Sequence, residues 1–146
     1  MSHSGMRNAL NEYKKVGVHG GIESASPHRL IQMLMEGALD KISAAKGFME
    51  RGDVAKKGEF ISWAISIIDG LRVSLDKNLD NEIVNNLDAL YDYMNRTLME
   101  ANINNDTAKL DEVARLMHDI KTGWDGIENE AQQLAASEEA KSRIGG

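Results

Sequence analysis

Apolar residues recur every three or four positions along four long stretches of this chain, and that spacing is what most constrains its fold. The stretch after residue 106 is the most regular, with apolar positions at Leu110, Val113, Met117, Ile120, Trp124, Ile127, Ala131 and Leu134. Because an α-helix has about 3.6 residues per turn, this spacing draws one apolar stripe along a helix. Four such stripes predict four amphipathic helices that bury their stripes against one another.

Capping residues divide the stretches into separate helices. Ser26 before Pro27 is typical of a helix start, Gly52 of a helix end, and Asp53 of the next start. We expect helices at about 27–51, 54–78, 81–103 and, after the capping residues Asn104, Asn105 and Asp106, up to about 134. Connections this short make consecutive helices antiparallel neighbours. The sequence therefore predicts an all-α, antiparallel up-down-up-down four-helix bundle.

The bundle is expected to occupy residues 27–134, with a segment of different character on each side. Residues 1–26 are polar and glycine-containing, and we expect them to be a mobile segment with one short amphipathic helix. In that helix Leu10 and Tyr13 lie three apart on one face, and we expect the segment to pack on the bundle. Residues 135–146 are small and charged, so we expect them to fray.

The composition excludes several classes of protein. The 146 residues include no cysteine, which excludes a disulfide scaffold, a thiolate zinc site and a cysteine nucleophile. A net charge of -6 argues against non-specific nucleic-acid binding, which needs clustered basic residues. The apolar runs are far shorter than a membrane span, and the N-terminus lacks a hydrophobic signal region. We therefore expect a cytoplasmic protein with no nucleic-acid partner and no membrane insertion.

Metal and cofactor chemistry lack the residues they need. A di-iron bundle requires a glutamate three residues before a histidine on each of two helices, but Arg115 precedes His118 and Ala25 precedes His28. His118 flanks the fourth stripe and is expected to be a surface histidine. No glycine loop that could bind phosphate and no serine in a nucleophile context is present. We predict no metal and no cofactor.

One pair of carboxylates is spaced for acid–base chemistry. Asp88 and Asp92 lie four apart, but they face away from the stripe of the third helix. Exposed like charges keep ordinary pKa values and make a poor acid and base pair, so we interpret them as solubilising. The chain is therefore predicted not to be an enzyme.

The helices also carry more apolar residues than one stripe needs. These residues lie beside the stripes of the first three helices: Ile31, Met35, Leu39, Phe60, Ile65, Ile67, Val84, Tyr91 and Tyr93. Second stripes indicate either a wider internal contact or an apolar groove that is open to a partner. Both interpretations stay open, and Leu10 with Tyr13 could cover such a groove.

Two blocks of sequence resemble a known family. The run 24–38, SASPHRLIQMLMEGA, resembles the pattern S-A-S-P-x-x-L-x-x-M-L-[FY]-[DE]-G-A of FliS, the flagellin-specific export chaperones of bacteria. Matches continue with AISIID at 64–69, NLDALYDYM at 86–94 and Trp124, so the resemblance covers about residues 8–127. It departs at Met35, where the family has an aromatic residue, and before the third helix, where paired glycines are replaced.

The resemblance implies a function for the second stripes. FliS-like proteins are helical bundles that bind the disordered C-terminal region of flagellin in the cytoplasm, prevent its premature polymerisation and aid its delivery to the flagellar type III export apparatus. We therefore expect flagellin-binding residues at Leu10, Tyr13, Ile31, Met35, Ile65, Val84, Tyr91 and Tyr93. The alternative is a regulatory or scaffolding adaptor that binds another folded flagellar protein.

Overall fold

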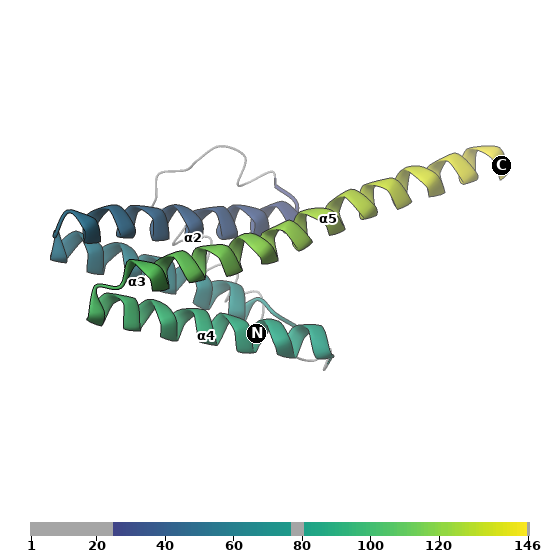
Figure 1. Ribbon diagram of the computed structural model, residues 1–146. Helices are drawn as coiled ribbons and strands as arrows, with labels where there is room; N and C mark the ends of the chain where they lie inside the picture. The colour runs from purple at the N-terminus through teal and green to yellow at the C-terminus, as the bar shows by residue number, and fades with distance from the viewer. Residues whose placement is uncertain (1–24, 77–80, 146) are drawn as a thin grey trace.

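The computed structural model describes the backbone of residues 25–76 and 81–145, and the side chains of residues 25–76 and 81–127. This part of the chain contains four helices: α2 (Pro27–Glu50), α3 (Val54–Val73), α4 (Glu82–Asn104) and α5 (Thr107–Gly145) (Figure 1). None of the described helices is long and apolar enough to cross a membrane. The N-terminal segment, with Leu10 and Tyr13, lies outside the described residues.

The helices form the predicted bundle. Each helix packs against the next one in the chain, and α5 returns to pack against α2, so the four helices close a ring. Figure 1 shows that consecutive helices run in opposite directions. The all-α, antiparallel four-helix bundle expected from the spacing of apolar residues is therefore confirmed.

The predicted stripes meet in one core. Its fully buried side chains come from all four helices: Leu34, Ala38, Ala45, Ile61, Ala64, Ile68, Leu71, Met94, Leu98, Ala101, Leu110, Val113 and Met117. Ile83 is an exception, because it was expected on the third stripe and is 72% exposed in the first turn of α4. Of the second stripes, Met35, Ile67, Val84 and Tyr91 are buried, so much of the apolar surplus serves internal packing.

The predicted caps form. The Ser26 Oγ accepts the amide of Arg29 at 3.1 Å, and the Asp53 Oδ1 accepts the amide of Lys56 at 3.1 Å. Gly52 takes φ +74, a left-handed conformation that favours glycine, between α2 and α3. These local hydrogen bonds set where the first two helices begin.

Two helix ends differ from the prediction. Helix α3 ends at Val73 and not near residue 78. At this end the Ser74 Oγ donates to the carbonyl of Leu71 at 2.7 Å, and the Leu75 amide donates to that of Arg72 at 3.2 Å in a tighter turn. Helix α5 continues to Gly145, beyond the expected end near residue 134, and its C-terminal part projects from the bundle in Figure 1. The division into a bundle and a frayed tail stays a prediction.

Candidate functional site

One end of the bundle contains an apolar cavity of about 630 Å³. It lies where α2 begins, α3 ends and α4 begins, with α5 as the remaining wall. The apolar side chains that line it are Pro27, Ile31, Met35, Leu71, Leu75, Ile83, Val84, Leu87, Tyr91, Ile120, Trp124 and Ile127. Ile83 and Ile127 are 72% and 53% exposed, so the cavity opens to solvent between α4 and α5.

The lengths of the helices explain why the described residues leave this space unfilled. Helix α3 is the shortest of the four described helices, with 20 residues, and it stops at Val73. Beyond that point Ser74, Leu75 and Asp76 continue the cavity wall, and Leu75 is the one apolar residue among these three. Toward the same end, α4 and α5 spread apart in Figure 1. Side chains that would be packed in a longer bundle therefore border a cavity.

Polar contacts fix the wall formed by α2 and α5. The ring of Trp124 stacks on that of His28, with centroids 4.3 Å apart and planes 4° from parallel, and its Nε1 donates to the carbonyl of His28 at 3.0 Å. The Asp125 carboxylate accepts Gln32 Nε2 at 2.6 Å and Lys121 Nζ at 2.8 Å. The hydrogen bond from Lys121 is the main reason that the pKa of Asp125 lies below its ordinary value. These contacts join the first turns of α2 to the middle of α5.

A charge network fixes the opposite wall, between α3 and α4. The Arg72 Nε contacts Asp88 Oδ1 at 2.7 Å, and the Arg72 Nη1 contacts Asp92 Oδ1 at 3.0 Å. The interpretation of Asp88 and Asp92 as merely solubilising charges is therefore wrong. Their partner stands on another helix, which a repeat along one helix cannot reveal.

The cavity gathers four of the predicted binding residues. Ile31, Met35, Val84 and Tyr91 all line it, whereas Ile65 and Tyr93 do not. Met35 and Tyr91 are each only 2% exposed, so they belong to the core as well as to the cavity wall. Burial raises the pKa of Tyr91 to about 12, so its hydroxyl stays protonated near neutral pH.

The two remaining described residues have other surroundings. Ile65 packs against the core, and Tyr93 is exposed, with its hydroxyl donating to Glu112 Oε2 at 2.6 Å. The sequence prediction also missed part of the cavity wall. It assigned Leu71, Leu87 and Trp124 to core stripes. These residues line a cavity because α3 ends at Val73, earlier than predicted.

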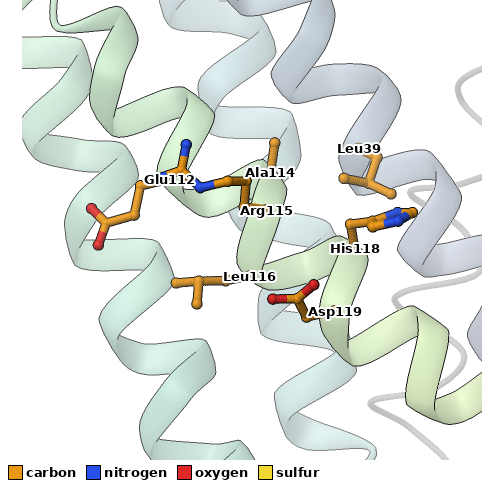
Figure 2. Close-up of a pocket in the computed structure, with 7 residues that line it drawn as sticks. All are labelled: Leu39, Glu112, Ala114, Arg115, Leu116, His118 and Asp119. Atoms are coloured by element: carbon orange, nitrogen blue, oxygen red, sulfur yellow. The ribbon is translucent and has the colours of Figure 1, made fainter.

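A second hollow, of about 590 Å³, lies on the outer side of α5. Figure 2 shows Glu112 and Leu116 pointing toward one side of α5, while His118 points toward Leu39 of α2 on the other. The charged groups therefore do not converge on one point. His118 is exposed, as expected, and no cluster of metal-ligating residues occurs among the residues described here. The apolar cavity is the better candidate site.

Comparison with known proteins decides the family. The sequence matches the family described as "Flagellar protein FliS" over residues 9–131. The chain belongs to the FliS family. All the residues that line the cavity fall within the matched range.

Curated FliS relatives match over most of their length. The flagellar secretion chaperone FliSB of Pseudomonas aeruginosa is 48% identical over 119 residues, which are 82% of this chain and 94% of that protein. The FliS of Vibrio cholerae is 41% identical over 133 residues, 91% of this chain and 98% of that one. The FliS of Salmonella typhimurium is 45% identical over 123 residues, 84% and 91% of the two chains.

The names of these relatives bear on function. FliS proteins are named as flagellar secretion chaperones and not as enzymes, so the predicted family and the predicted lack of enzymatic activity are confirmed. Membership in the FliS family supports the role of a flagellar export chaperone.

Proposed function

We propose that this chain binds the disordered C-terminal region of flagellin in the cytoplasm, prevents its premature polymerisation and delivers it to a component of the flagellar type III export apparatus. The observation that carries this proposal is the apolar cavity at the open end of the bundle, whose wall includes Ile31, Met35, Val84 and Tyr91. Relatives of the chain are named as flagellar secretion chaperones, which fits a cavity that holds an export substrate.

The size and lining of the cavity limit how a bound segment can lie. A space of about 630 Å³ accommodates a few apolar side chains and not a whole helix. The segment would therefore place its anchor residues in the cavity and lie along the neighbouring helices, in the helix-in-groove mode. Ordering a disordered segment costs about 2 to 5 kcal/mol or more, so contacts outside the cavity are also required. Leu10 and Tyr13 stay predicted contacts.

The first experiment asks whether the C-terminal region of flagellin is needed. The purified chain is mixed with full-length flagellin and with flagellin that lacks its C-terminal region, and each mixture is run on a sizing column. We expect a complex with the full-length protein only. Equal co-elution of the truncated flagellin would contradict the proposal and favour the alternative, an adaptor that binds another folded flagellar protein.

The second experiment asks whether the cavity is the site, and the chain offers a matched pair of isoleucines. Ile31 and Ile65 are both partly buried and pack on the core, but only Ile31 lines the cavity. We expect Ile31→Ala to weaken binding of a flagellin C-terminal peptide by about 1 to 3 kcal/mol, because few buried apolar groups dominate such interfaces. Ile65→Ala should bind as the wild type does. Calorimetric titration measures the affinity of each variant for the peptide. Equal losses of binding free energy in the two variants would contradict the placement of the binding site in the cavity.

A further inference from the structure

Three charged residues join α3 to α4 just outside the cavity. Arg72 in the last turn of α3 contacts Asp88 through two nitrogens, Nε at 2.7 Å and Nη2 at 3.4 Å, and Asp92 through Nη1 at 3.0 Å. We call Arg72, Asp88 and Asp92 the clasp. Arg96 lies against its outer side, with Nε 3.0 Å from Asp92 Oδ2. A guanidinium that bonds two carboxylates in this way fixes geometry as well as charge.

The clasp and the cavity share the same turns of helix. Each clasp residue directly follows a residue that lines the cavity: Leu71, Leu87 and Tyr91. None of the three clasp residues lines the cavity, so the clasp supports the cavity wall from outside the cavity. Any shift of the clasp moves the wall.

The N-terminal half of α4 needs such a support. The C-terminal half packs into the core through Met94, Leu98 and Ala101, which are fully buried. The N-terminal half packs on the core through Tyr91, but Val84 and Leu87 border the cavity, so among the described residues this half meets fewer packing partners. The less densely packed end of a helix opens locally more easily than the rest of its bundle.

Charge within α4 adds to this need. Asp88 and Asp92 lie four apart on the helix, and like charges at that spacing destabilise it. Arg72 contacts both carboxylates and removes the repulsion. The hydrogen bond to Asp88 is the main cause that raises the pKa of Arg72, so the guanidinium stays charged at any physiological pH. Because the three side chains are partly exposed, added salt should weaken the clasp.

We propose that Arg72, Asp88 and Asp92 are positioning residues for the cavity: they hold the N-terminal half of α4 against the end of α3 and keep the cavity preformed without lining it. A preformed site binds more tightly because less ordering remains to be done on binding. The effect on affinity rests on the proposed function, whereas the effect on α4 belongs to the unbound chain.

Hydrogen exchange of the unbound chain tests the effect on α4. We expect Arg72→Gln to speed exchange of the amides of residues 86–92 by about 5- to 30-fold, the factor that 1 to 2 kcal/mol gives, and to leave those of 95–104 nearly unchanged. Arg72→Lys keeps the positive charge but loses the planar guanidinium that bonds two carboxylates. Its exchange rates should lie between those of the wild type and of Arg72→Gln. The matched control is Lys46→Gln, which removes another interhelical ion pair, from Lys46 to Asp111 at 2.9 Å, away from the cavity.

The binding assay uses the same variants with a flagellin C-terminal peptide. Arg72→Gln should raise the dissociation constant by about 5- to 30-fold, Lys46→Gln should not, and the exchanged pair Arg72→Glu with Asp88→Arg should recover toward the wild type. Unchanged amide exchange over residues 86–92 in Arg72→Gln, or equal acceleration over the whole of α4, would overturn the proposed role of the clasp. If the wild type fails to bind the peptide, the proposed function fails, and the exchange result alone decides the clasp.

Discussion

Replacing Lys57 by methionine should destabilise the bundle far more than the same change at its neighbour Lys56. Lys57 is only 4% exposed, and its ammonium donates to the carbonyl of Asn102 at 2.9 Å and to Asn105 Oδ1 at 2.7 Å. Both acceptors stand at the C-terminal end of α4, where carbonyls lack partners within the helix and the helix dipole favours a cation. Lys57 therefore ties the beginning of α3 to the end of α4.

The expected loss comes from two opposing effects. Each hydrogen bond from a charged group contributes about 1.5 to 3 kcal/mol, and a cation near a helix C-terminus about 0.3 to 1 kcal/mol more. Against this, keeping the ammonium away from water costs several kcal/mol, a cost that methionine removes while it fills the place of the apolar stem. We expect a net loss of about 1 to 3 kcal/mol. For a chain of this length, that lowers Tm by roughly 3 to 10 °C.

Thermal and urea unfolding, followed by far-ultraviolet circular dichroism, measure the difference. Lys56→Met is the control, because the Lys56 side chain is 53% exposed and its Nζ lies 3.8 Å from Glu59 Oε2. A surface pair of that kind contributes about 0 to 0.5 kcal/mol. If Lys57→Met proves as stable as Lys56→Met, the two hydrogen bonds do no more than offset the cost of burial, and the reasoning is refuted.

Two further predictions concern charge and pH. The pKa of Asp125 is lowered, mainly by Lys121, so its carboxylate stabilises the fold above the unfolded pKa of about 3.9, and this contribution is lost as the pH falls through the lower folded pKa. Asp125→Asn should therefore melt below the wild type near neutral pH, with a gap that narrows in acid; a gap of constant size would contradict this. Burial is the main cause that lowers the pKa of Lys41, so its charged form disfavours folding, and the stability of the wild type should rise as the pH rises from that lowered pKa toward the unfolded value of about 10.4. Lys41→Met should be at least as stable as the wild type near neutral pH, despite losing the contact of Nζ with the Trp63 ring at 4.4 Å, and a loss above about 1 kcal/mol in urea unfolding would contradict it.

The fold could be predicted because its determinants are local. Ser26, Asp53 and Asn81 each accept an amide of the first turn that follows them, and neighbouring residues suffice to recognise such caps. The predicted end of α3, near residue 78, was wrong. Leu75 continues the apolar spacing and packs on the core, although the helix has already ended at Val73. Periodicity reports which residues face inward and does not mark where the helix stops.

The candidate site was predictable only in part. An apolar residue beside a stripe can be recognised from spacing, as Ile31 and Val84 were, but the same signal selects Ile65, which faces no cavity. The distinction depends on which end of the bundle is left open, and helix lengths decide that. The clasp and Lys57 escape sequence reasoning for a different reason, because their partners lie 16 to 48 residues away in the chain.

The two ends of the bundle are built by different means, and this difference bears on how a cavity can persist in so small a protein. At the end where α4 turns into α5, Lys57 donates to the carbonyl of Asn102 and to Asn105 Oδ1, and Leu98 and Leu110 are fully buried nearby in the chain. At the other end, exposed Ile83 and Ile127 border a space that the described side chains leave unfilled. Stability need not be uniform across a structure, so a well-packed end can carry the fold while the other opens and closes locally. An occupant of the cavity then adds its binding free energy to the weaker end, which is where a bound segment stabilises the chain most.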